Sequence, residues 1–161
     1  MFKRLYLKVF FKLFPSYRLR KSGAQIGKNV FFGESVYVEL ENAKLLKIGD
    51  GSVLSAFSKI ILHDSSLNNI DNFDVLYGKV VIGKNVYIGS GSIILPGTDI
   101  GEGTIVGAGS LVKGVLKKNS VYAGNPVRYL SSVGQLKSKW KKRNNPLTFL
   151  KKMPRWNKNS N

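Results

Sequence analysis

The chain has 161 residues, which is enough for one domain with a buried core but leaves little room for a second. Hydrophobic residues make up 43% and the mean hydropathy is −0.09, which excludes a disordered chain and a membrane-embedded one. There is no cysteine and one histidine, so disulfides, thiolate nucleophiles and metal sites built from several histidines are excluded.

The formal net charge of +17 comes from the two ends of the chain. Residues 1–21 contain seven Lys and Arg and no acid, and residues 128–161 contain ten and no acid. Residues 22–127 contain nine lysines and nine acids, so this middle part is neutral. A basic tail attracts nucleic acid, anionic lipid and acidic glycan alike, so the charge alone does not identify a partner.

Residues 1–21 are predicted to contain a short basic amphipathic helix. At helical spacing Arg4, Lys8 and Lys12 form one stripe, the opposite face is apolar, and Pro15 ends the pattern. Such a helix suits the headgroup region of an anionic membrane, and it equally suits docking on its own domain or on a partner subunit. A signal peptide is not expected, because lysines interrupt the apolar stretch.

A period of six residues organises the middle of the chain. Every sixth residue from 82 to 112 is aliphatic, and glycine follows four of these positions. Six is not a helical period, and turn-forming glycine at a fixed offset indicates short strands wound into a coil that stacks on itself. We expect the aliphatic residues to point inward and three faces to close a triangular prism. These residues are Ile82, Ile88, Ile94, Ile100, Val106 and Val112.

The six-residue phase breaks twice, after Val38 and after Ile60. The second break is expected to form a loop over 64–79, and the only histidine, His63, lies where it opens. Loops on a rigid scaffold commonly carry sites, and imidazole titrates near neutral pH, so His63 is the candidate general base. Asp64 and Asp74 would orient the imidazole, bind an acceptor, or only cap turns of the loop.

Three motifs, together with the repeat, resemble the hexapeptide-repeat acyltransferases, and among them the sugar and polysaccharide O-acetyltransferases. The motifs are IILHD over 60–64, GKVVIGKNVYIG over 78–89, and IVGAGSLVK with AGNPVR over 105–113 and 123–128. The resemblance implies an all-β fold, namely a left-handed parallel β-helix over 22–127, with a short N-terminal helix over 1–21 and a basic, partly helical tail over 128–161.

The resemblance also implies acetyl-CoA as cosubstrate and supports His63 as the catalytic base. No metal is expected, and because the chain has no cysteine and no serine paired with a base in an evident motif, direct transfer is expected and not an acyl-enzyme. Backbone N–H groups at Ser90 and Gly91 would face the thioester carbonyl. The family often has Thr-Lys and then proline after the Gly-Ala-Gly-Ser coil, whereas Lys113 comes one place early here and the proline is missing. The further residues expected to contact coenzyme A, along the pantetheine groove or at the phosphates, are Tyr87, Ala108, Lys113 and Arg128.

The sequence therefore predicts an acetyl-CoA-dependent O-acetyltransferase that acts on a sugar hydroxyl in capsule or lipopolysaccharide biosynthesis. The resemblance implies a homotrimer with sites between prisms, and the basic tails suggest a cytoplasmic enzyme at the anionic inner face of the cell membrane. Transfer to an amino-sugar amine or a xenobiotic is the alternative within enzymes, and a non-catalytic scaffold that binds membrane or polyanion is the alternative of another class. Nucleic acid is disfavoured as a partner, because no recognisable nucleic-acid module is present.

Overall fold

The computed structural model describes residues 15–142. Residues 1–14 and 143–161 lie outside this part, and with them the amphipathic pattern expected before Pro15. Within it, residues 15–21 are helical. The residues after Pro15 are therefore helical, whereas the sequence analysis expects the pattern to end at Pro15. No helix of the described residues is long and apolar enough to cross a membrane.

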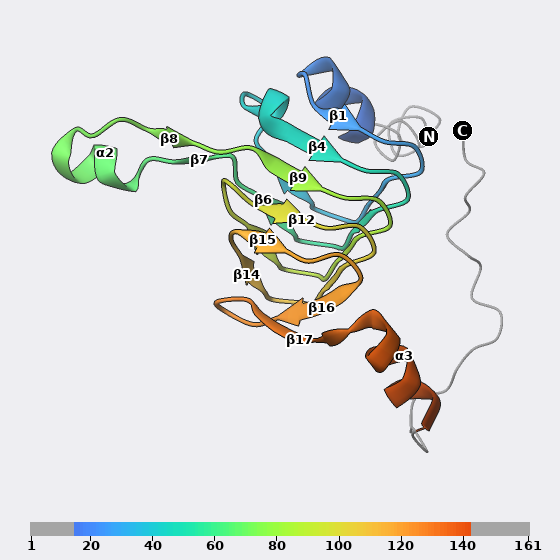
Figure 1. Cartoon of the computed structure of the whole chain (residues 1–161). Helices are drawn as coiled ribbons and strands as arrows, with labels where there is room; N and C mark the ends of the chain where they lie inside the picture. Colours follow the sequence, from blue (N-terminus) through green and yellow to red (C-terminus); the bar gives the residue numbers. More distant parts are fainter. Residues whose placement is uncertain (1–14, 143–161) are drawn as a thin grey trace, which may run out of the picture.

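Three sheets of very short strands form a prism (Figure 1). Sheet A has the order β1 (Gln25–Ile26), β4 (Leu46–Ile48), β9 (Val80–Ile82), β12 (Asp99–Ile100) and β15 (Val115–Leu116). Sheet B has the order β17 (Arg128–Ser132), β16 (Ser120–Ala123), β13 (Ile105–Val106), β10 (Tyr87–Ile88), β5 (Val53–Leu54) and β2 (Phe31–Phe32). Sheet C has the order β14 (Leu111–Val112), β11 (Ile93–Ile94), β6 (Lys59–Ile60) and β3 (Tyr37–Val38). The coil of short stacked strands predicted by the six-residue period is confirmed.

Aliphatic side chains stack in ladders inside the prism, because parallel strands pair in register. Ile94 pairs with Ile60 in one neighbouring coil and with Val112 in the other, and all three side chains are fully buried. Every position predicted to point inward between 82 and 112 is at most 1% exposed. Burial of apolar surface on this scale is the main favourable contribution to folding.

The corners of the prism use small residues for two physical reasons. Buried hydroxyls satisfy backbone carbonyls there, as where Ser92 Oγ donates to Gly107 O at 3.0 Å. Adjacent coils also approach closely, so a Cβ placed on Gly89 would lie 2.4 Å from the backbone nitrogen of Ala108. The glycines that mark the period are therefore required by the stacking of the coils.

The N-terminal end of the prism is covered by residues 15–21. Leu19 from this helix is 3% exposed and belongs to the core. Arg20 fastens the helix to the first coil, donating from Nε to Ile26 O at 3.1 Å and from Nη2 to Gly27 O at 2.9 Å. The helix thereby shields apolar residues that a first coil cannot bury by itself.

The two breaks in the period leave the prism differently. The first forms a short 3₁₀ turn, η1 (Ala43–Leu45), beside the prism. The second forms a long arm that projects from the prism (Figure 1), built from strand β7 (His63–Asp64), helix α2 (Ser66–Asp71) and strand β8 (Leu76–Tyr77). β7 and β8 pair antiparallel, with His63 opposite Tyr77, which fixes the base of the arm.

The C-terminal end of the prism closes with a hairpin. β17 pairs antiparallel with β16, so strand pairing extends beyond residue 127, where the sequence analysis placed the start of the tail. Helix α3 (Val133–Lys142) follows directly and leads away from the prism (Figure 1). Its exposed side chains include Lys137, Lys139 and Trp140.

We predict that Ile94→Ala lowers the free energy of unfolding by about 2–5 kcal/mol, because it leaves a cavity between Ile60 and Val112. Urea denaturation followed by circular dichroism would measure the loss. Val115→Ala is the control, since Val115 is 78% exposed and surface substitutions usually change stability by at most about 0.5 kcal/mol. Equal losses in the two variants would contradict the inward ladder.

Candidate active site

Both breaks in the period leave the prism at the same corner. β3 and β6 are neighbours in sheet C, and Val38 pairs in register with Ile60. The residues that follow, Glu39 in one coil and Ile61 in the next, therefore start their excursions side by side. We call this the C–A corner, which also contains residues 95–98 and 113–114 of later coils.

This stacking brings Glu39 against His63. Glu39 Oε2 lies 2.8 Å from His63 Nδ1 and accepts a hydrogen bond from the Leu62 backbone N–H at 3.1 Å. Glu39 is 8% exposed, and the His63 side chain is 38% exposed. Because an ionised carboxylate only accepts hydrogen bonds, Nδ1 carries the proton in a neutral imidazole and Nε2 retains its lone pair.

A base oriented by a buried acid is a recurring catalytic arrangement. The acid holds the imidazole in one tautomer and orientation, and it stabilises the imidazolium that forms when Nε2 takes a proton. The Glu39–His63 pair can do this without a third group on the same chain. Glu39 is the site residue that sequence reasoning missed.

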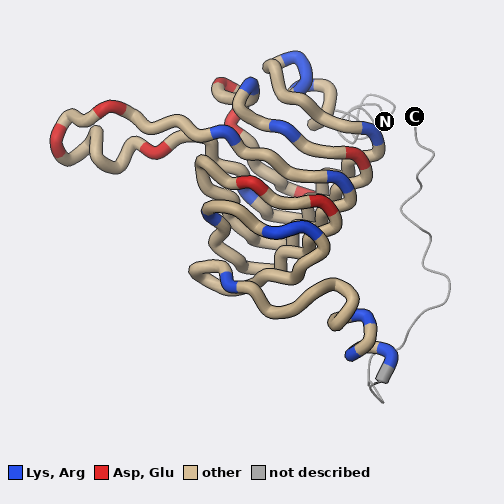
Figure 2. The backbone as a smooth tube through the Cα atoms, viewed as in Figure 1, with Lys and Arg blue, Asp and Glu red and all other residues tan. Residues whose placement is uncertain are grey.

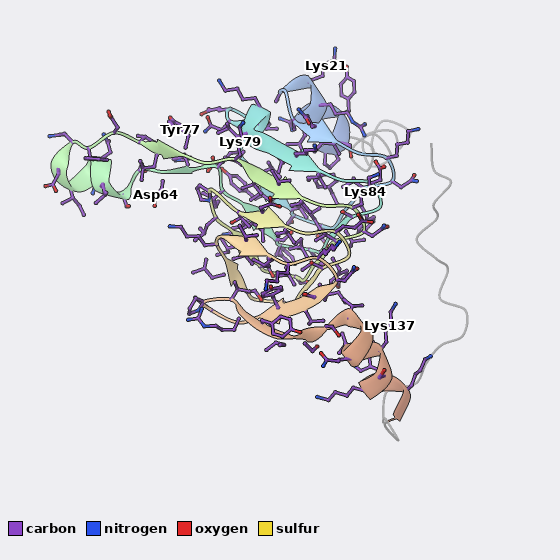
Figure 3. The ribbon with its side chains drawn as sticks, in the orientation of Figure 1. Lys21, Asp64, Tyr77, Lys79, Lys84 and Lys137 are labelled. Carbon is purple, nitrogen blue, oxygen red and sulfur yellow. The ribbon has the colours of Figure 1, made fainter. Side chains whose placement is uncertain are left out.

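A pocket of about 510 Å³ lies in front of the histidine. The base of the arm forms one side of it, with Tyr77 6.2 Å from His63 between ring centroids. Figure 3 shows Tyr77 and Asp64 near the base of the arm, on its two strands. The later coils of the C–A corner also contribute. The lining residues are Ile61, His63, Asp64, Leu76, Tyr77, Gly78, Leu95, Pro96, Gly97 and Lys113.

Asp64 lines this pocket, but its carboxylate is hydrogen-bonded within the arm. Asp64 Oδ1 accepts a hydrogen bond from the Ser66 backbone N–H at 3.0 Å. Hydrogen bonds from the backbone and side chain of Ser66 lower the pKa of Asp64, and the charges of Lys113 and His63 add to this effect. Of the alternatives for Asp64, the geometry matches the turn cap, since the acid bonded to His63 is Glu39. Asp74 lies exposed between α2 and β8 and does not line the pocket.

The residues expected to contact the thioester and pantetheine lie around a different corner. Ser90 and Gly91 follow β10, and Ala108 follows β13, so all three lie at the B–C corner between sheets B and C. Tyr87 on β10 is 45% exposed. The B–C corner and the C–A corner lie at opposite ends of the sheet C strands. A single chain therefore does not bring these residues together with His63.

The backbone donors at the B–C corner differ in availability. The Gly91 N–H donates to Ala56 O at 3.0 Å, which leaves it unable to face a ligand in this conformation. Among the described residues, the N–H groups of Ser90 and Ala108 have no acceptor, and both residues are exposed. The groups able to bind a carbonyl or an amide oxygen are therefore those of Ser90 and Ala108.

The two basic residues expected at the phosphates belong to neighbouring segments, because the Val127 N–H donates to Leu111 O at 2.9 Å, but only one of them lines the pocket. Lys113 follows β14 and lines the His63 pocket. Arg128 begins β17 in the last hairpin, is exposed, and donates from Nη1 to Val127 O at 3.0 Å. The structure therefore places Lys113, and not Arg128, beside the candidate base.

We predict that the Nδ1–H tautomer dominates in neutral His63 and that Glu39→Met abolishes this preference by removing the acceptor. ¹H–¹⁵N NMR of the imidazole measures the tautomer directly, and the chain contains one histidine, so the signal needs no assignment. Asp64→Asn is the matched control and should leave the spectrum unchanged. A dominant Nε2–H form in the unmodified protein would contradict the pairing.

Comparison with known proteins supports the fold and the repeat. Residues 79–114 match the family model described as bacterial transferase hexapeptide (six repeats). No curated protein matches the sequence.

Solved structures of acetyltransferases are similar to the chain. The maltose O-acetyltransferase from Clostridium difficile 630 is 29% identical with a TM-score of 0.52, over 71% of this chain and 72% of that one. The soybean serine acetyltransferase apoenzyme is 28% identical with a TM-score of 0.53, over 67% of this chain and 40% of that one. A galactoside acetyltransferase in complex with coenzyme A is 20% identical with a TM-score of 0.57, over 86% and 88%, a likeness of fold alone.

These matches confirm the resemblance to hexapeptide-repeat acyltransferases and the left-handed parallel β-helix that it implies. They were expected from the period and from the motifs around residues 60–64 and 78–89. The chain therefore carries the hexapeptide repeat of bacterial transferases on the left-handed parallel β-helix typical of that family.

Proposed function

We propose that the protein is an acetyl-CoA-dependent O-acetyltransferase that acts on a sugar hydroxyl. The observation that carries this proposal is the single histidine, held by the buried Glu39 at 2.8 Å in a pocket of the prism. A similar structure supports the choice of chemistry, since it is a maltose O-acetyltransferase that is 29% identical to this chain.

In this proposal His63 Nε2 takes the proton of the acceptor hydroxyl as the hydroxyl oxygen attacks the thioester carbonyl. The carbon–sulfur bond then breaks, and the departing thiolate takes the proton from the imidazolium. General base catalysis of this kind contributes about 10²–10⁴-fold. Glu39 stabilises the imidazolium between the two steps, so no acyl-enzyme is required.

The N–H groups of Ser90 and Ala108 fit the requirements of acetyl-CoA binding. Both are exposed and lack an acceptor among the described residues. Ser90 would stabilise the oxyanion that develops on the thioester, and Ala108 would bind an amide oxygen of pantetheine beside the Tyr87 ring. Arg128, exposed in the last hairpin, would meet the phosphates.

A homotrimer would unite the two corners, with His63 of one chain facing Ser90 and Ala108 of the next. The arm supports such an assembly. It exposes Leu67, Ile70 and Phe73 by 46%, 71% and 54%, more apolar surface than an isolated arm would favour. Residues 64–77 contain three aspartates and no Lys or Arg, and Figure 2 shows this contrast with the rest of the chain.

The exposed C-terminal surface suggests where the enzyme works. Tyr129, Leu130 and Trp140 are exposed together with Lys137, Lys139 and Lys141 of α3. Residues 128–161 contain no acid. Aromatic side chains and lysines suit an anionic membrane surface, where each basic residue contributes about 1 kcal/mol. We therefore propose that the enzyme works at the cytoplasmic face of the membrane and acetylates a lipid-linked glycan for the cell surface.

We predict that His63→Ala lowers acetyl transfer by about 10²–10⁴-fold through loss of the base. Release of coenzyme A thiol from acetyl-CoA would be measured with sugar acceptors, and with amino sugars as the competing acceptor class. Asp64→Asn should retain most activity, because its carboxylate serves the loop.

The control for this variant is calorimetric titration with coenzyme A at high salt, with ATP as competitor because a protein of charge +17 binds anions indiscriminately. His63→Ala should bind coenzyme A normally. Undiminished transfer by His63→Ala would overturn the mechanism. Absence of coenzyme A binding in the unmodified protein would favour a non-catalytic scaffold.

We further predict that the double variant Asp71→Lys with Asp74→Lys weakens the trimer, because it reverses the charge of the acidic arm that this proposal places against the next chain, whose residues outside 64–77 include 26 Lys and Arg and six acids. Analytical ultracentrifugation at low and high salt would measure the change. The control is Glu102→Lys, which makes the same change of charge as one of the two substitutions but lies on the prism. A monomeric unmodified protein would contradict the assembly.

A further inference from the structure

The ammonium group of Lys113 has no partner in the part of the chain that the structure describes. Lys113 follows β14, lies at the C–A corner and is exposed at the wall of the His63 pocket. Within residues 15–142 no carboxylate lies within 4.0 Å of it, and its side chain forms no hydrogen bond. Its three N–H donors are therefore available to a molecule in the pocket.

Asp64 is the acidic residue among those that line the pocket, but it forms no ion pair with Lys113. Its Oδ1 atom is engaged by the Ser66 N–H at 3.0 Å. The charge of Lys113 lowers the pKa of Asp64 less than the hydrogen bonds from Ser66 do, and the two side chains form no ion pair. A carboxylate or phosphate on a bound molecule would approach the ammonium more closely than Asp64 does.

The rest of the pocket wall suits the uncharged part of a sugar. Leu76, Tyr77, Leu95 and Pro96 present apolar and aromatic surface, which packs against the carbon face of a pyranose ring. Among the described residues of this wall, Lys113 is the one lysine or arginine that could meet a charged substituent, and it lines the same pocket as His63. Recognition of charge and removal of the proton would then concern one bound molecule.

We propose that Lys113 selects an acceptor that carries a carboxylate or phosphate, so that the enzyme acts on an acidic sugar. This rests on the proposed function, and it assigns Lys113 to the acceptor and not to the phosphates of coenzyme A, for which the sequence motif suggested it. The placement supports this assignment, because Lys113 shares the pocket of His63 while the Ser90 and Ala108 donors lie at the other corner.

The kinetic test compares acceptors that differ in charge alone. The unmodified enzyme should prefer glucuronate or glucose 6-phosphate to glucose, and the two acids separate a carboxylate from a phosphate ligand. Lys113→Met should lower kcat/KM for the preferred acid by about tenfold to a hundredfold, as expected for a charge-assisted hydrogen bond. Transfer to glucose and the KM for acetyl-CoA should change little, and Lys113→Arg should restore the preference.

Lys118→Met is the control, because Lys118 is an exposed lysine outside the pocket. A raised KM for acetyl-CoA in Lys113→Met, with an unchanged ratio of acidic to neutral acceptor, would assign Lys113 to the cosubstrate and overturn the proposal. Equal kcat/KM for glucose and both acids in the unmodified enzyme would also overturn it, while leaving the acetyltransferase function intact.

A binding experiment separates this proposal from the activity. The His63 imidazole signal would be followed by NMR while glucuronate, glucose 6-phosphate or glucose is added. Saturable shifts with an acid, absent with glucose and lost in Lys113→Met, would support the site even if no transfer were found. Identical responses to the acids and glucose would overturn it.

Discussion

The register between stacked coils is the constraint on which the rest of the structure depends. A strand alternates its side chains between two faces, so a slip of one residue would turn an inward ladder outward. The same register that buries Ile60 against Val38 and Ile94 also sets Glu39 of one coil over His63 of the next. The same register therefore determines both the core packing and the orientation of His63, and a change of register would disrupt both.

Much of the fold could be predicted from the sequence because the prism repeats one local environment. Each inward position has the same kind of neighbours, so the regular spacing of the aliphatic residues from Ile82 to Val112 predicts that they are buried. The arm does not repeat anything. The sequence located its start at His63 and its length, but the pairing of β7 with β8 and the short helix α2 depend on contacts that no period encodes.

The sequence could identify the candidate site residue that is marked by its residue type, but not the one that is brought to the site by the stacking of coils. His63 stands out because it is the only imidazole, whereas Asp64 drew attention only as its neighbour in sequence. Glu39 lies 24 residues away from His63, and its role becomes visible only once Val38 and Ile60 are known to pair. A signal was present, since both breaks follow inward positions that are 22 residues apart, the length of one coil plus an insertion.

The prism also explains why one chain presents only half of the proposed chemistry. A straight ladder of buried aliphatics keeps its corners apart, so His63 cannot move toward Ser90 and Ala108 without breaking sheet C. Under the proposed function, the site would be completed by placing the C–A corner of one copy against the B–C corner of the next. One chain would then bind the acceptor, with Lys113 contacting its charged group and His63 taking its proton. The neighbouring chain would present the thioester. Such a division would separate the acceptor pocket and the arm from the Ser90 and Ala108 donors, so that a substitution near His63 need not disturb the binding of the cosubstrate.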